Sequence, residues 1–324
     1  MDKIIRDKGL IPSPHHILSM LLRYTGCLIG AAIGDAMGMP GEGTPADLWR
    51  AECSFRRPYR GHPNDALSPG QYTDDTQLML LTAELLAGRA FSLESYAERL
   101  KALYRSGVFR FPDGSIVAAC IHLLDGSPPQ EGGVNSTTSG CLPAGIPFAL
   151  AYQDPVDIRE TVARVCSVTH TNPAAIAGST GIAMLIHHTL AGSPDDLALA
   201  CGEVGREDPL LGQKIRHALR LEKEGIELEH AIRLIGNDLS VYQTIPIAFF
   251  LMARYASATD LLSMVGHIGG NSDTIGLICG AYLGAKFGMN ILPPHLVEGL
   301  EDHGRIEAIA ARLLEVSADI PTRV

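Results

Sequence analysis

The sequence predicts an all-α fold, organised as a single compact multi-helix domain. Apolar residues make up 46% of the chain and charged residues 19%, and the 34 glycines favour helices that pack closely through small side chains. Apolar side chains recur at helical spacing, whereas repeated runs of alternating apolar and polar residues are absent. No linker and no repeat of fixed period divides the chain. We therefore expect one domain over residues 21–324, preceded by an N-terminal leader over residues 1–20.

The first predicted helix covers residues 21–38, which read LLRYTGCLIGAAIGDAMG. Its length and its lack of a β-branched run favour a buried helix over a strand. Residues 38–70 follow and are rich in Gly, Pro, Asn and Asp, which is the composition of a long surface loop. Because loops of this length inside a compact domain are generally functional or mobile, this loop is a candidate part of a site.

The next helix is predicted to start at Thr76 and to stop at Gly88. The leucines at positions 78, 81 and 85 are spaced by three and four residues, as on one face of a helix. Further helices are predicted at residues 92–104, 115–124, 156–168, 173–191, 211–223, 244–255, 258–266, 274–287 and 293–316.

The net charge of −10 argues against an extended basic surface for nucleic acid or for an anionic membrane. No apolar stretch reaches the roughly 18 uncharged residues of a membrane span, and the strongest, residues 245–252, has the length of a core helix. The N-terminus lacks the apolar segment of a signal peptide. The seven cysteines are widely spaced without a CxxC pair, which favours reduced, buried thiols. We expect a cytoplasmic monomer that binds neither nucleic acid nor membrane.

Two adjacent carboxylates, Asp74 and Asp75, stand at the start of the helix that follows Thr73. Asp74 as N-cap, with Gln77 three residues later, is close to a capping box and leaves Asp75 without a role. A similar start, Asn-Ser-Asp-Thr at residues 271–274, precedes a later helix of small residues. If the two starts met in space, their oxygen-bearing side chains would suit a hard cation, and ordinary capping is the alternative.

Five motifs occur in one order: GAAIGDAMGMPGE at residues 30–42, YTDDTQ at 72–77, THTNPAAIAG at 169–178, QTIPIAFF at 243–250 and GGNSDTIGLICGAYLGA at 269–285. Together they resemble the ADP-ribosylglycohydrolase family, over about residues 26–288. The resemblance implies an all-α fold with two bound divalent cations, Mg²⁺ or Mn²⁺. It also implies hydrolysis of the N- or O-glycosidic bond between ADP-ribose and an acceptor, which is a modified protein or a small conjugate.

The resemblance also implies roles for individual residues. The implied metal ligands are Thr73, Asp74, Asp75, Asn271, Asp273 and Thr274. The implied catalytic residues are Glu42, Asp75 and Asp273. Glu42 would position water or gate the metal site, His170 would lie beside the bound ADP-ribose, and Ser136 falls near the loop that contacts ribose and phosphate. We expect Asp35 to cap or buttress a helix turn behind the ligands.

These residue types fit glycosidic cleavage, which passes through an oxocarbenium-like state that needs a positioned nucleophile and stabilised charge. Two cations can hold ribose hydroxyls and orient water while a carboxylate takes its proton. No Lys or Arg lies between Phe111 and Ile158, so a diphosphate bound by residues 132–141 would use backbone N–H groups, hydroxyls and helix N-termini. A plain polar loop is the alternative for this segment.

Two departures from the family pattern bear on function. Asn271 stands where most relatives carry Asp, which removes a negative charge from the second ligand cluster. SGCLPAGIP at residues 139–147 replaces the family's Asn-Gly stretch and its Met-Arg pair. These departures motivate a second hypothesis, a catalytically weak ADP-ribose-binding or immunity-type protein of the same fold. An α-helical isoprenoid synthase, suggested by DDTQL, fits poorly because the later carboxylate of that motif is missing.

The other histidines receive no special role from the sequence. His62 lies in the loop after Glu42 and is expected to be solvated. His187 and His188 are adjacent within a predicted helix, and adjacent residues do not share a helix face, so a paired metal site is not expected there.

Overall fold

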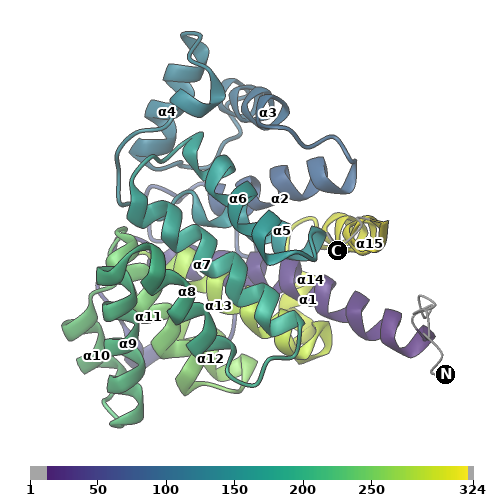
Figure 1. Cartoon of the computed structure of the whole chain (residues 1–324). Coiled ribbons are helices and arrows are strands. Elements are labelled where there is room, and N and C mark those ends of the chain that lie inside the picture. The colour runs from purple at the N-terminus through teal and green to yellow at the C-terminus, as the bar shows by residue number, and fades with distance from the viewer. Residues whose placement is uncertain (1–12, 320–324) are drawn as a thin grey trace, which may run out of the picture.

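The computed structural model describes residues 13–319 and confirms the all-α prediction. Within this range the chain forms fifteen α-helices, four 3₁₀ helices and no β-strand, apart from two isolated bridges (Figure 1). The α-helices are α1 (Pro14–Gly38), α2 (Asp74–Ala87), α3 (Leu93–Arg105), α4 (Gly114–Leu124), α5 (Leu142–Ala151), α6 (Pro155–Ser167), α7 (Pro173–Leu190), α8 (Asp196–Glu207), α9 (Pro209–Lys223), α10 (Leu228–Ile235), α11 (Val241–Arg254), α12 (Ala258–Val265), α13 (Ser272–Phe287), α14 (Pro294–Gly299) and α15 (His303–Asp319). The 3₁₀ helices are η1 (Met39–Gly41), η2 (Leu48–Arg50), η3 (Pro129–Glu131) and η4 (Met289–Ile291).

Helices α1 and α13 pack against each other, antiparallel, at the centre of the domain (Figure 1). Small residues four positions apart meet in pairs along them: Gly26 with Gly284, Gly30 with Gly280, Gly34 with Gly276, and Gly38 with Ser272. A Cβ added at Gly26 would lie 2.7 Å from the carbonyl oxygen of Gly284, so the two backbones touch and only glycine fits. We call this contact the glycine seam. The order of its pairs sets the end of α1 against the start of α13.

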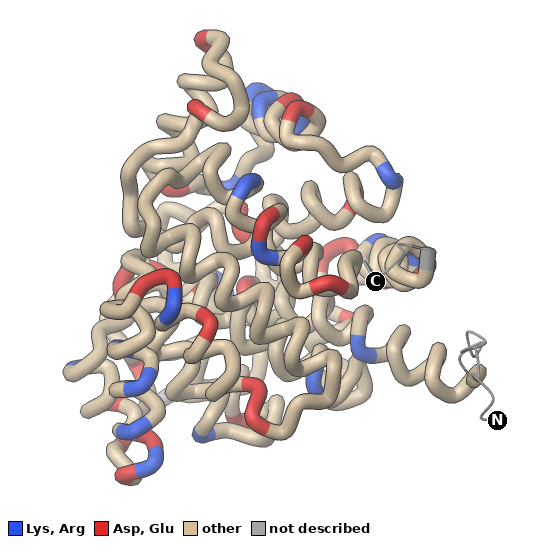
Figure 2. The backbone as a smooth tube through the Cα atoms, viewed as in Figure 1, with Lys and Arg blue, Asp and Glu red and all other residues tan. Residues whose placement is uncertain are grey.

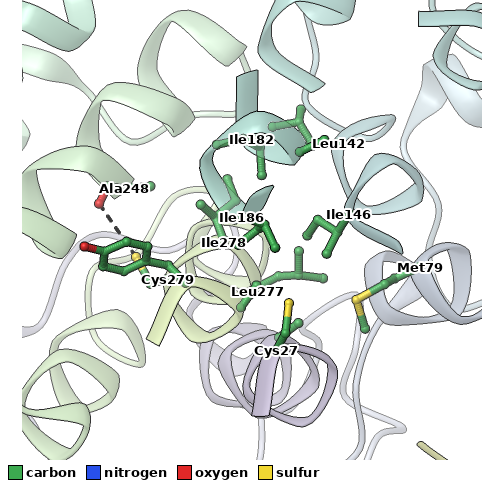
Figure 3. Packing of buried hydrophobic residues seen from close by; sticks show 14 of the residues in the cluster. Cys27, Met79, Leu142, Ile146, Ile182, Ile186, Ala248, Leu277, Ile278 and Cys279 are labelled. Carbon is green, nitrogen blue, oxygen red and sulfur yellow. Dashed lines mark hydrogen bonds between the residues drawn. The ribbon is translucent and has the colours of Figure 1, made fainter. Parts of the chain in front are cut away.

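The apolar core surrounds this helix pair. Figure 3 shows side chains from α1, α2, α5, α7 and α13 meeting in one cluster. Its labelled members include Cys27, Met79, Leu142, Ile146, Ile182, Ile186, Leu277 and Ile278. The seven cysteines are all free and six of them are buried, in agreement with the expected reduced thiols. A rigid core of this kind holds the ends of α1, α2 and α13 in fixed positions.

Three helices, α5, α8 and α10, are not predicted by the sequence pattern. Helix α5 contains Pro143, Gly145 and Pro147, which generally disfavour a helix interior, yet all of its residues are buried. Burial of this apolar segment therefore outweighs its weak local propensity. The single helix predicted at residues 293–316 is wrong, because α14 and α15 are separated at Asp302, whose φ of 54° lies in the left-handed region.

Helix α1 begins at Pro14, so the predicted boundary between leader and domain at residue 20 falls inside it. Residues 1–12 of the predicted leader lie outside the described residues. The prediction that no apolar stretch reaches about 18 uncharged residues holds for residues Pro14–Gly41, because Arg23 and Asp35 interrupt them. The same segment nevertheless contains an 18-residue window with a mean hydropathy of 1.6, which by length and composition alone could cross a membrane. Because 61% of that window is buried inside the fold, the segment matches the central core helix of a globular domain.

Lys and Arg residues are interspersed with Asp and Glu on the outer helices (Figure 2). Several of them form local ion pairs, such as Arg233 with Glu229 on α10 at 2.6 Å. Arg254 of α11 reaches Glu227 at 3.3 Å. These exposed pairs contribute little to stability and serve mainly as a solvated surface.

Candidate active site

The start of α2 places two carboxylates inside the protein. Thr73 is the N-cap of this helix, and its Oγ1 accepts the backbone N–H of Asp75 at 3.3 Å. The prediction that Asp74 is the N-cap is therefore wrong, and both aspartates belong to the first helical turn. Both are buried. Since a hydroxyl provides the cap, neither carboxylate is explained by capping.

Asp35, in the last turn of α1, holds the start of α2. One of its carboxylate oxygens accepts the backbone N–H of Thr73 at 3.0 Å, and the other accepts the backbone N–H and the hydroxyl of Thr76 at 3.0 and 2.6 Å. A carboxylate at a helix N-terminus is favoured because the first N–H groups of the helix have no partner within it. Asp35 thus ties α2 to α1 from behind Asp74 and Asp75.

The start of α13 meets the start of α2. Thr274 Oγ1 donates to Asp75 Oδ2 at 2.6 Å, and the backbone N–H of Thr274 donates to Asp273 Oδ1 at 2.9 Å. Asp273 and Thr274 are both buried. Two acidic helix starts that are 198 positions apart by their aspartates, Asp75 and Asp273, therefore share one site.

Glu42 reaches this site from the residue that follows η1. Its carboxyl group is within hydrogen-bonding reach of Asp273. Burial raises the pKa of Glu42 to about 7, an effect that a hydrogen bond from Asn64 opposes and the nearby Asp35 reinforces. A carboxyl group with this pKa can give or take a proton near neutral pH.

The loop after Glu42 supplies two residues that sequence reasoning missed as part of the site. Asn64 Nδ2 donates to Glu42 Oε2 at 2.7 Å. His62 Nδ1 accepts the backbone N–H of Asn64 at 3.0 Å, so Nε2 carries the proton and donates to the Glu42 carbonyl oxygen at 2.8 Å. His62 is only 2% exposed, and the expectation that it is solvated is wrong. Loop composition gave no signal that this imidazole folds back on Glu42.

Five buried or half-buried carboxyl groups gather around this point: Asp35, Glu42, Asp74, Asp75 and Asp273. Burial is the largest cause that raises each pKa, and for Asp74 the neighbouring charges of Asp75 and Asp273 raise it further. Among the side chains of residues 13–319, no group of three or more His, Cys, Asp or Glu is placed so that it could hold a metal ion. The donor set of carboxylates and hydroxyls nevertheless suits hard divalent cations, whose charge would remove the repulsion.

His170 lies in a second part of the site, built from loops. The imidazole is fully buried, and burial lowers its pKa. Its Nε2 is 2.8 Å from Thr138 Oγ1 and its Nδ1 is 2.9 Å from Thr169 Oγ1. Ser136 Oγ lies 3.1 Å from the same Thr138 hydroxyl, so the two predicted substrate residues, Ser136 and His170, are joined through Thr138.

Asp113 is a further residue that sequence reasoning missed. Its Oδ1 caps α4 by accepting the backbone N–H groups of Ser115 and Ile116 at 2.6 and 2.9 Å. Its Oδ2 lies 3.8 Å from His170 Nε2. The charge of Asp113 also contributes to the raised pKa of Asp75. Asp113 therefore lies beside His170 and acts electrostatically on Asp75. Its only sequence signal is an Asp-Gly-Ser helix start.

Asn271 is buried at the N-cap of α13 but does not cap the helix with its side chain. Its Nδ2 donates instead to Ser139 Oγ at 2.8 Å and to Thr244 Oγ1 at 2.9 Å. The segment at residues 139–147 and the 243–250 motif thus both contact the residue at which the chain departs from its expected pattern.

Residues 13–319 thus form an all-helical domain in which two helix starts bring carboxylates and hydroxyls together at one buried site. A sequence model of the family described as ADP-ribosylglycohydrolase matches residues 18–321, and the chain belongs to this family. An uncharacterized protein from Archaeoglobus fulgidus is 33% identical over 298 residues, which cover 91% of this chain and 96% of the relative. ADP-ribosylhydrolase ARH3 from Danio rerio is 26% identical over 343 residues, which cover 92% of this chain and 91% of the relative.

The fold agrees with a solved structure described as an ADP-ribosylglycohydrolase-related protein complex. The two structures superpose with a TM-score of 0.73 at 24% sequence identity, over 92% of this chain and 99% of the other. This similarity establishes the fold, and the family assignment rests on the sequence match.

Proposed function

We propose that this chain is a divalent-metal-dependent hydrolase that cleaves the N- or O-glycosidic bond between ADP-ribose and an acceptor. The acceptor is an ADP-ribosylated protein side chain or a small ADP-ribosyl conjugate. The observation that carries the proposal is the convergence of Glu42, Asp75 and Asp273 from three separate segments at one buried place. Membership of the ADP-ribosylglycohydrolase family and the likeness to a relative named ADP-ribosylhydrolase support the choice of substrate class.

The proposed cofactors are two divalent cations, Mg²⁺ or Mn²⁺. The residues proposed to hold them are Thr73, Asp74, Asp75, Asn271, Asp273 and Thr274. Bound there, the cations would supply Lewis-acid polarisation and orient water and ribose hydroxyls. The proposal is supported by the oxygen-only donor set and by the raised pKa values of the buried aspartates, which burial raises most and the neighbouring carboxylates raise further.

Glu42 is the proposed general base. Its pKa of about 7 suits the removal of a proton from the attacking water at neutral pH, and Asn64 holds one carboxylate oxygen in place. Asp75 and Asp273 supply the other two carboxyl groups of the proposed catalytic set. Because burial lowers the pKa of His170, its imidazole is neutral near pH 7, and its contact with the Thr138 hydroxyl orients the loop that is proposed to bind ADP-ribose.

We propose a cytoplasmic monomer that acts on ADP-ribose-bearing substrates and binds neither nucleic acid nor membrane. The net charge of −10 supports this proposal, because an acidic protein is repelled by extended anionic surfaces such as nucleic acid or an anionic membrane.

The test is release of ADP-ribose from ADP-ribosyl-arginine and ADP-ribosyl-serine, measured with Mg²⁺ and again with chelator. We expect release with Mg²⁺, loss of release with chelator, and a loss of at least 100-fold in kcat for Glu42→Gln. The matched control is Glu160→Gln, which makes the same change on an exposed residue of α6 and is expected to keep full activity. Release that is unchanged by chelator would remove the cations from the proposal.

The second candidate is a catalytically weak ADP-ribose-binding or immunity-type protein of the same fold. Asn271 favours it, because one carboxylate of the expected ligand set is absent. Binding of ADP-ribose without release from any conjugate, at any Mg²⁺ or Mn²⁺ concentration, would select this candidate over the hydrolase.

A further inference from the structure

Asn271 forms both of its side-chain hydrogen bonds through the amide nitrogen. Nδ2 donates to Ser139 Oγ at 2.8 Å and to Thr244 Oγ1 at 2.9 Å. All three residues are almost fully buried. A primary amide has two N–H donors, so these two bonds use the donor side completely.

The direction of the hydrogen bond between Asn271 and Thr244 follows from a second hydrogen bond that the Thr244 hydroxyl makes. The Thr244 hydroxyl donates to the backbone carbonyl oxygen of Asp238 at 2.8 Å. A hydroxyl has a single proton and a carbonyl oxygen can only accept, so Thr244 Oγ1 can only accept from residue 271. This fixes which end of the Asn271 amide faces Thr244, a choice that the outline of an amide alone would leave open.

The opposite end of the amide, Oδ1, therefore points away from the two hydroxyls. Among residues 13–319 no side-chain or backbone donor forms a hydrogen bond with Asn271 Oδ1. This oxygen is also absent from the fully buried polar atoms that lack a partner, so it is not completely enclosed by protein. A neutral amide oxygen is an ordinary ligand for Mg²⁺ or Mn²⁺. Asp273, two residues further on, is a proposed ligand of the same cluster, and Oδ1 is the side-chain atom of Asn271 that these two hydrogen bonds leave unused.

We propose that Thr244 is a positioning residue for the cation site: by accepting from Nδ2 while its own proton is held by Asp238, it keeps the Asn271 carbonyl oxygen available as a neutral ligand. The 243–250 motif acquires a role through Thr244. This inference rests on the proposed function, since it concerns the cations of that site.

The test is Mn²⁺ binding to the metal-free full chain, measured by calorimetry without substrate. We expect Thr244→Val, which keeps the shape but removes the acceptor, to weaken the Mn²⁺ site that includes Asn271 about fivefold, equal to about 1 kcal/mol. Thr244→Ser retains the hydroxyl and is expected to bind within twofold of the unmodified chain. Ser139→Ala, which removes the other acceptor, should cause a loss similar to that of Thr244→Val.

The matched control is Thr82→Val, because Thr82 is equally buried but its hydroxyl donates within α2 to Leu78 at 3.3 Å. This variant should bind Mn²⁺ as the unmodified chain does. Unchanged affinity in Thr244→Val, or an equal loss in Thr244→Ser or Thr82→Val, overturns the positioning role and leaves the hydrolase proposal standing. No Mn²⁺ binding by the unmodified chain overturns both the positioning role and the cations of the proposed function.

Discussion

The Glu42 carboxyl group provides a test in which stability reports directly on the site. Burial raises its pKa to about 7 from an ordinary value of 4.5. Between these pH values the folded state keeps a proton that the unfolded state has lost, so the free energy of unfolding falls as the pH rises from about 4.5 to about 7 and stays reduced above it. The difference corresponds to about 3 kcal/mol at pH 8. Glutamine resembles the protonated acid and keeps an oxygen for Asn64.

We therefore expect metal-free Glu42→Gln to unfold with a free energy about 3 kcal/mol higher than the unmodified chain at pH 8, and less than about 1 kcal/mol higher at pH 5. The assay is urea unfolding in the presence of chelator at both pH values. Glu160→Gln on α6 is the matched control and should change stability at neither pH. An equal gain at pH 5 and pH 8, or a loss at pH 8, would refute the reasoning that a costly buried charge sits at Glu42.

Three further predictions concern the seam, the loop and the cations. Gly280→Ala should lower the free energy of unfolding by more than about 3 kcal/mol, because its Cβ would overlap the Gly30 backbone, whereas Gly304→Ala, where a Cβ meets nothing within 4 Å, should be neutral in the same urea assay. Asn64→Ala removes the hydrogen bond that lowers the Glu42 pKa, so the acidic limb of the rate against pH should move up by about half a pH unit, and an unmoved limb would count against Glu42 as the base. Mg²⁺ should raise the melting temperature more at pH 8 than at pH 5, since protons compete for the same carboxylates, and an equal rise would contradict binding by them.

The long helices are predictable because their apolar spacing and their N-caps agree. Helices α7 and α9 begin at Pro173 and Pro209, after Asn172 and Asp208 whose side chains accept from the first turn, and both were found to within two residues. Helix α5 is not predictable in this way, because Pro147 and its neighbours lower the local propensity and only tertiary burial makes the segment helical. Local pattern thus decides an element only where tertiary packing does not oppose it.

The residues of the candidate site also fall into those that a sequence motif predicts and those that only the folded structure reveals. The carboxylates at the starts of α2 and α13 carry a motif, and their meeting is visible in the bond from Thr274 to Asp75. His62 and Asn64 carry none, because their contacts with Glu42 depend on how a loop of about thirty residues folds back. The sequence also does not identify Asp113 as a site residue. An Asp at a helix N-cap has the same sequence pattern whether or not it lies beside His170, which only the structure shows.

The glycine seam explains why these separate pieces form one site. Helices whose contact faces carry larger side chains lie 8–10 Å apart, a spacing set by those side chains. With glycines at every fourth position of α1 and α13, the backbones touch, and Ser272 Oγ donates to the Gly38 carbonyl oxygen at 2.7 Å. Glu42 leaves η1 four residues after Gly38, and Asp273 follows Ser272, so the close approach delivers both carboxylates to one point. The repeat of small residues is visible in the sequence, but its partner and direction are set only by the packed fold, which makes the seam the structural cause of the acidic cluster.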